Sequence, residues 1–190
     1  ESNAFLIRGP NVMMGYWNNP AATAAIISSD GWLNSGDIAS IDAQGHVTIT
    51  GRLKEIIVLS TGEKIPPADM EAAILRDPLF EQAMLIGEAR SYLSVMVVLN
   101  TAHWQNVVSQ YGLDASLNTD QQRQQVEEIL LDKITEQTSE FPGYAKIRRV
   151  ALIQEPWNVE NGLLTPTLKL KRAKVLEKYV REVERLYAGH

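Results

Sequence analysis

The side chains with the most evident nucleotide-binding chemistry are Asp37 and Arg52, at the two ends of a predicted strand, turn and strand. Asp37 follows Gly36, and we predict a turn there that leaves a short, ionised and exposed carboxylate. A carboxylate can accept hydrogen bonds from two neighbouring hydroxyl groups, which suits the 2′,3′-diol of a ribose. Alternatively, Asp37 is a solvated turn residue and Arg52 belongs to a surface ion pair.

A basic run, LKLKR at residues 168–172, is the second candidate. By itself it is also explained as the start of a helix whose lysine stems lie along apolar surface. The histidines show no spacing typical of metal ligands, so we predict no metal site from His46, His103 and His190.

The composition is that of a globular protein, with 45% hydrophobic and 22% charged residues among 190. A formal net charge of -5 disfavours nucleic acid as the main partner. The absence of cysteine excludes disulfides and thiolate chemistry and fits a reducing compartment, so we expect a cytoplasmic protein, or one peripheral to a membrane. No apolar run approaches the roughly 18–20 residues that a membrane span needs.

The elements expected before residue 54 are mainly strands. We predict a short strand at residues 5–7, a helix that begins near Pro20, and a half-buried strand in which Val47 and Ile49 share one face. Because the first strand starts almost at once, we expect the chain to be a piece of a longer protein.

After residue 54 the pattern alternates between strands and helices. Residues 56–65 are typical of a β-hairpin with Gly62 in its turn, followed by a helix over residues 68–76. Strands are predicted at residues 82–87 and 92–99, and the second is apolar on both faces, which indicates a central strand.

The remaining predictions concern helices and one further strand. A helix over residues 102–111 should end at Gly112, and Thr119 with Gln122 forms a capping-box pattern for the next. A strand follows at residues 147–153. The last helix, from about Lys171, should bury one stripe of side chains: Ala173, Leu176, Val180 and Val183.

Taken in order, these motifs resemble the signature motifs of the adenylate-forming superfamily, which includes acyl-CoA synthetases, peptide synthetase adenylation domains and luciferase. The matching stretches are ESNAFLIRGPNVMMGYWNNPAAT, GWLNSGD, GRLKEIIVLSTGEKIPPADME and LTPTLKLKR. Within the superfamily, GEKIPPADME and LTPTLKLKR are most similar to long-chain fatty acyl-CoA synthetases. The resemblance covers the chain but thins between about residues 100 and 141.

The resemblance implies an α+β fold in two parts. Residues 1–53 would be the β-rich end of a large N-terminal adenylating domain. Residues 54–190 would be a small C-terminal swinging domain, with a central sheet flanked by helices and a projecting β-hairpin. Lys54 matches the hinge between them. Such a swing would serve two half-reactions, because one static pocket suits both poorly.

The resemblance also implies roles for individual residues. Asp37 would bind the ribose hydroxyls of ATP and Arg52 would assist. Lys169 matches the catalytic lysine at the α-phosphate. Many relatives have Ser-Gly before this lysine whereas this chain has Thr167-Leu168, so Lys171 stays open as the alternative.

Two further matches lie in the C-terminal part. Gly62 would let the backbone approach the pantetheine arm of CoA, although it could equally be a simple hairpin glycine. Glu71 matches a glutamate for which we expect a structural role, in capping or pairing.

The implied activity is that of a long-chain fatty acid–CoA ligase, which forms acyl-AMP from a fatty acid and ATP and then a thioester with CoA. The phosphate loop, the acyl pocket and the Mg²⁺ ligand would belong to the missing N-terminal domain, so the fragment alone should be inactive. Two alternatives stay open. The acyl group could go to a carrier protein, or the domain could be a non-catalytic one that retains the fold.

Overall fold

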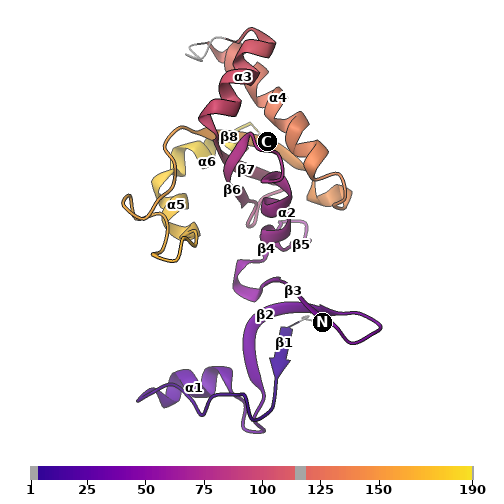
Figure 1. The fold of residues 1–190 in the computed structure, drawn as a ribbon, viewed down its shortest axis with the longest axis vertical. Coiled ribbons are helices and arrows are strands. Elements are labelled where there is room, and N and C mark those ends of the chain that lie inside the picture. Colours follow the sequence, from indigo (N-terminus) through magenta and orange to yellow (C-terminus); the bar gives the residue numbers. More distant parts are fainter. Residues whose placement is uncertain (1–3, 114–118, 190) are drawn as a thin grey trace. The chain divides into compact units, whose positions relative to one another are not determined.

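The structure is a computed structural model that describes residues 4–113 and 119–189. It contains two compact units, Glu1–Ile56 and Ile57–His190. Each unit has its own sheets (Figure 1).

The first unit is built on a three-stranded antiparallel sheet in the order β1-β2-β3. Asn19 caps the first helix, because its Oδ1 accepts the N–H of Ala22, and Pro20 occupies the first helical position. The predicted strand at residues 5–7 and the helix from Pro20 are confirmed. The elements are β1 (Ala4–Ile7), α1 (Pro20–Ile26), β2 (Leu33–Ile41), β3 (Val47–Arg52) and the 3₁₀ helix η1 (Leu53–Glu55).

The β2–β3 ribbon carries apolar side chains that are exposed within this unit. Val47 and Ile49 are 45% and 51% exposed, and Ile41, the cross-strand partner of Val47, is 68% exposed. The alternating pattern predicted a strand with one buried face, and the structure corrects that prediction for β3. The alternation still places Val47 and Ile49 on one face of the strand, but no other described part of this unit covers that face.

The second unit is a mixed α+β domain with a central three-stranded sheet and a separate two-stranded hairpin. In the central sheet β6 pairs antiparallel with β7, and β7 pairs parallel with β8. Its elements are β4 (Ile57–Val58), β5 (Lys64–Ile65), α2 (Pro67–Ile74), β6 (Phe80–Ile86), β7 (Leu93–Leu99), α3 (Thr101–Tyr111), α4 (Asp120–Gln137), the 3₁₀ helix η2 (Gly143–Ala145), β8 (Ile147–Ile153), α5 (Arg172–Lys178) and α6 (Val180–Tyr187).

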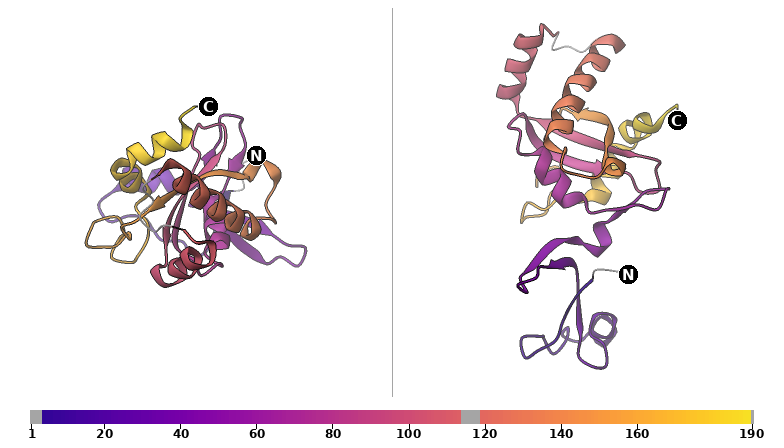
Figure 2. Two further views of the ribbon diagram at one scale, coloured as in Figure 1. Left: turned by 90° about the horizontal axis from the view of Figure 1, so that it is seen from above. Right: turned by 90° about the vertical axis from the view of Figure 1, so that its right-hand side faces the viewer.

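Helices cover both faces of the central sheet (Figures 1 and 2). Every residue of β7 is buried, which confirms the prediction of a central strand. Alternate β7 residues enter two different cores, as the period of two along a strand requires. The first core contains side chains of α2, α4 and the hairpin, and the second contains side chains of α5 and α6.

Local signals set the helix ends in this unit. Thr119 and Gln122 form the predicted capping box at the start of α4. Gly112 adopts the left-handed conformation that ends α3, with φ of 61°. Pro67 opens α2 as predicted, although the helix ends at Ile74 rather than Arg76. None of the helices in the described ranges combines the length and the hydropathy that crossing a bilayer requires.

The C-terminal segment differs from the prediction of one helix. It is broken at Tyr179 into α5 and α6, and the break rotates the buried face. Of the predicted stripe only Val183 is buried, whereas Leu176 is 38% and Val180 is 54% exposed. Val183 is joined in the core by three side chains outside the predicted stripe: Val175, Leu186 and Tyr187.

Candidate functional site

Asp37 lies within strand β2, not in the predicted turn. Gly36 has φ of 75°, a value that glycine adopts without penalty, and its N–H donates to Oδ1 of Asn34. The N–H of Asp37 donates to Oγ of Ser35, and that hydroxyl donates to the carbonyl of Phe5 in β1. The turn-like residues stay in a strand because β2 pairs on both sides, and register shifts next to them absorb the irregular backbone.

Strand pairing sets Asp37 directly opposite Arg52. The Nε of Arg52 lies 2.9 Å from Oδ1 of Asp37, and the two side chains are 56% and 24% exposed. An ion pair this exposed adds little stability. The importance of the pair is its geometry. Strand pairing holds a carboxylate and a guanidinium side by side where a ligand can reach them, and together they could bind a diol and an adjacent anion.

Lys54 and Gly62 lie on either side of the boundary between the two units. Lys54 is exposed in η1 of the first unit, between Arg52 and Ile56. Gly62 lies in the turn of the β4–β5 hairpin, with φ of 95° and open space where a Cβ would stand. That glycine is needed for its backbone conformation rather than for packing.

The hairpin is docked on the turn formed by residues 87–90. The N–H of Ala89 donates to the carbonyl of Val58 at 2.8 Å, and the N–H of Ser60 donates to the carbonyl of Arg90 at 2.9 Å. Glu88 adds a side-chain contact, because its Oε2 accepts the N–H of Val58 at 2.9 Å. No local pattern in the sequence marks Glu88 or Arg90, because their contacts join residues about thirty positions apart.

Lys169 lies at the end of a tight turn, Thr165 to Leu168. The N–H of Leu168 donates to the carbonyl of Thr165 at 2.8 Å, and the N–H of Lys169 donates to Oγ1 of the same threonine at 3.0 Å. The side chain of Lys169 is exposed, whereas Lys171 is half-buried at the N-cap of α5. The loop thus presents Lys169, and not Lys171, from its tip.

Leu168 occupies the glycine position of the Ser-Gly pattern noted in the sequence. It has φ of 60°, the left-handed conformation that costs a non-glycine residue about 1–2 kcal/mol. Its side chain is 71% exposed, so little burial offsets that strain. The backbone before Lys169 is therefore bent in a way that glycine would adopt more easily.

Arg172 ties the end of this loop to the domain. Its Nη1 lies 2.6 Å from Oε1 of Glu71 in α2, and its Nη2 donates to the carbonyl of Leu85 in β6 at 2.5 Å. The same Glu71 oxygen accepts the N–H of Leu85 at 2.7 Å. The side chains of Arg172 and Glu71 are only 22% and 16% exposed. The pairing role predicted for Glu71 is confirmed.

The structure thus pairs Asp37 with Arg52 in the first unit and places Gly62 and Lys169 in the second. Among the described residues no group of three acidic or histidine side chains could hold a metal ion, and His190 lies outside those residues. A groove of about 990 Å³ between α4, β8 and α6 is lined by none of the predicted site residues. The groove is therefore no evidence for nucleotide binding.

The chain matches the family model of the AMP-binding enzyme C-terminal domain over residues 54–190. It is 34% identical over 190 residues to a putative fatty-acid–CoA ligase of Mycobacterium tuberculosis, covering 100% of this chain and 33% of that protein. It is 31% identical to a long-chain-fatty-acid–[acyl-carrier-protein] ligase of Arabidopsis thaliana, covering 96% of this chain and 25% of the relative.

The chain is also similar to a solved structure of an adenylation domain. The adenylation domain of a carboxylic acid reductase from Segniliparus rugosus, in complex with AMP and a co-purified carboxylic acid, is 28% identical with a TM-score of 0.80. The similarity covers 97% of this chain and 28% of that one. The chain therefore spans a third or less of the length of these proteins.

Proposed function

The chain belongs to the adenylate-forming family of AMP-binding enzymes, and we propose that it is the C-terminal portion of a long-chain fatty acid–CoA ligase. The full protein would form acyl-AMP from a fatty acid and ATP and then transfer the acyl group to CoA. The observation that carries this proposal is the similarity, along almost the whole chain, to relatives named as fatty-acid–CoA ligases. The fragment alone would lack most of its nucleotide pocket and be inactive.

In the first half-reaction the carboxylate of Asp37 would accept hydrogen bonds from the ribose hydroxyls, with Arg52 beside it. The ammonium of Lys169 would follow charge as it shifts onto the α-phosphate oxygens while pyrophosphate leaves. Attack by a fatty-acid carboxylate needs no general base, so positioning and electrostatic stabilisation would dominate. Among the described residues no group of three acidic or histidine side chains would hold Mg²⁺.

In the second half-reaction the small domain would turn about Lys54 and bring the hairpin toward the acyl-adenylate. Gly62 supports this role, since the space around its Cα is open and its φ of 95° disfavours any side chain. A pantetheine arm could then lie against the backbone of the turn.

A second candidate function is transfer of the acyl group to a carrier protein. The observation that favours it is the 31% identity to the Arabidopsis thaliana relative named as an acyl-carrier-protein ligase. Full-length protein given fatty acid and ATP, with either CoA or a holo-carrier protein as acceptor, separates the two. Thioester on CoA supports the ligase, and thioester on the carrier alone overturns it.

The test of adenylation is Lys169→Ala in the full-length protein. We expect fatty-acid-dependent ATP–pyrophosphate exchange to fall by about 10²–10³-fold, as for the loss of one stabilising group at the transition state. Lys171→Ala is the matched control and should retain exchange. Wild-type exchange in Lys169→Ala would favour the non-catalytic reading, and loss in Lys171→Ala alone would move the role to that residue.

A further inference from the structure

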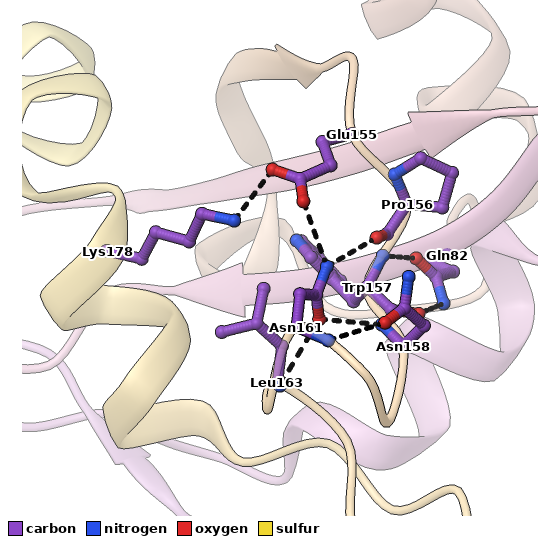
Figure 3. Close-up of polar contacts among 8 residues, drawn as sticks. All are labelled: Gln82, Glu155, Pro156, Trp157, Asn158, Asn161, Leu163 and Lys178. Carbon is purple, nitrogen blue, oxygen red and sulfur yellow. Dashed lines mark hydrogen bonds and ion pairs between the residues drawn. The ribbon is translucent and has the colours of Figure 1, made fainter.

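The segment that leads from β8 to α5, residues 154–171, includes Lys169 and contains no helix or ladder strand and only one isolated bridge, Leu164 with Leu170. We call it the lysine loop. Despite this irregular backbone, its first half is cross-linked by polar side chains (Figure 3). Among these polar side chains, that of Asn161 makes the most hydrogen bonds within the loop.

The side-chain amide of Asn161 makes four hydrogen bonds (Figure 3). Its Nδ2 donates to Oε1 of Glu155 at 3.2 Å and to the carbonyl of Pro156 at 2.9 Å. Its Oδ1 accepts the N–H of Asn158 at 3.0 Å and the N–H of Leu163 at 3.3 Å. An amide has two donor hydrogens and two acceptor lone pairs, so the full capacity of this side chain is used.

The partners of Asn161 are themselves held in place. The carboxylate of Glu155 lies 2.7 Å from Nζ of Lys178 in α5, and this contact, with the bond from Asn161, lowers the pKa of Glu155. Gln82 in β6 exchanges two hydrogen bonds with the backbone of Trp157, at 2.7 and 2.8 Å. The Trp157 side chain is only 2% exposed, in the second core.

A short run of contacts leads from Asn161 to the tip of the loop. Asn161 holds the N–H of Leu163, and the carbonyl of Leu163 accepts the N–H of Lys171 at 2.9 Å. That bond closes a ring of backbone from Leu163 to Lys171. Within the ring, the N–H of Thr165 donates to the carbonyl of Lys169, and its hydroxyl accepts the N–H of Lys169. Asn161 therefore fixes the entry of the ring, and Arg172 with Glu71 fixes its exit.

We propose that Asn161 is a positioning residue for the adenylation half-reaction, which it serves by holding the loop that presents Lys169. This inference rests on the proposed function. Asn161 acts through the backbone and not on the substrate, so its loss should lower the rate of adenylation rather than the affinity for ATP. The thioester step, which the proposed function assigns to the hairpin and Gly62, should be spared.

The deciding substitution is Asn161→Asp in the full-length protein. It keeps the shape and the acceptor but removes both donors and places a second carboxylate against Glu155. Asn158→Asp is the matched control, because it adds the same charge three residues away and keeps the oxygen that accepts the N–H of Asn161. Circular dichroism of both variants checks that they fold.

We expect Asn161→Asp to lower kcat for ATP–pyrophosphate exchange roughly 10–100-fold, with KM for ATP changed by no more than about twofold. Thioester formation from pre-formed acyl-AMP and CoA should stay near wild type, as should all activities of Asn158→Asp. Trypsin should cut after Lys169 faster in Asn161→Asp than in the control, since the loop opens more often. Combining Glu155→Gln with Asn161→Asp should recover part of the lost exchange activity, because the glutamine amide can donate a hydrogen bond to the new carboxylate.

Equal losses in the two single variants, or wild-type exchange in Asn161→Asp, would overturn the inference while leaving the proposed function intact. A rise in KM alone would also overturn it. Absence of exchange in the unmodified full-length protein would reject the proposed function itself, and the positioning role with it.

Discussion

The hairpin at residues 57–65 and the lysine loop at residues 154–171 are held by different kinds of contact. The hairpin depends mainly on its backbone. Its strands pair with each other, and backbone bonds join it to the turn at residues 87–90. Ile57, Leu59 and Ile65 are 5%, 4% and 2% exposed and anchor it in the first core.

The lysine loop also has backbone bonds and two buried side chains, Trp157 and Leu163, but polar side chains link it to β6, α2 and α5. Asn161, Gln82 and Glu155 form its cross-links, and Arg172 ties its end to Glu71. A backbone bond survives most substitutions, whereas a side-chain bond is lost when one residue changes. We therefore expect single substitutions to disturb the lysine loop far more than the hairpin.

The largest effect should come from Arg172→Ala, which removes the anchor at the end of the lysine loop. Glu71, whose side chain is only 16% exposed, would keep its bond to the N–H of Leu85 but lose its ion pair with Arg172. We expect the free energy of unfolding to fall by about 2–3 kcal/mol. Urea unfolding of the chain, followed by circular dichroism, measures it.

Arg76→Ala is the matched control for that substitution. Arg76 pairs with Glu140 at 2.9 Å, but both side chains are more than half exposed, at 63% and 57%. Its loss should cost about 1 kcal/mol or less. Equal costs for the two arginines would show that the Arg172 contact is no anchor.

A smaller effect, of opposite sign, is expected for Leu168→Gly. Relief of the left-handed strain at φ of 60° should exceed the extra chain entropy of glycine, for a net gain of roughly 0.5–1 kcal/mol. Leu176→Gly, at an exposed leucine inside α5, should instead lose about 1 kcal/mol. A loss in both variants would mean that Leu168 makes contacts that outweigh its strain.

An effect of similar size, but destabilising, should follow Glu88→Ala in the contact of the hairpin. One side-chain bond to the N–H of Val58 is lost, while the two backbone bonds beside it remain. We expect a cost of about 0.5–1 kcal/mol and faster hydrogen exchange at the Val58 amide only. Glu88→Gln retains an acceptor oxygen and should behave as wild type. General loss of protection across residues 57–65 would contradict the backbone account.

Much of the fold could be predicted from local patterns. The capping box at Thr119, the helix stop at Gly112 and the apolar run of β7 were each recognised within a few residues of sequence. The interactions responsible span no more than one helical turn or one strand face, so neighbouring residue types suffice to reveal them.

Other features could not be predicted because they depend on distant partners. Asp37 looked like a turn residue after Gly36, yet pairing with β1 and β3 keeps it in a strand. The C-terminal helix looked continuous, but it breaks at Tyr179, and a different stripe packs into the second core. The Asn161-Gly162 pair is typical of a turn, and no local pattern reveals that the asparagine side chain cross-links the lysine loop.

The sequence by itself determined most of the order of elements, the family resemblance and the choice of Asp37, Arg52, Gly62 and Lys169 as candidate site residues, since all of these are encoded in short motifs. Only the tertiary structure decided how Lys169 is presented. Glu71 and Arg172 are 101 residues apart, and Gln82 and Trp157 are 75 apart. Contacts at such separations form only when the sheet and helices bring the partners together, so no local pattern can disclose them.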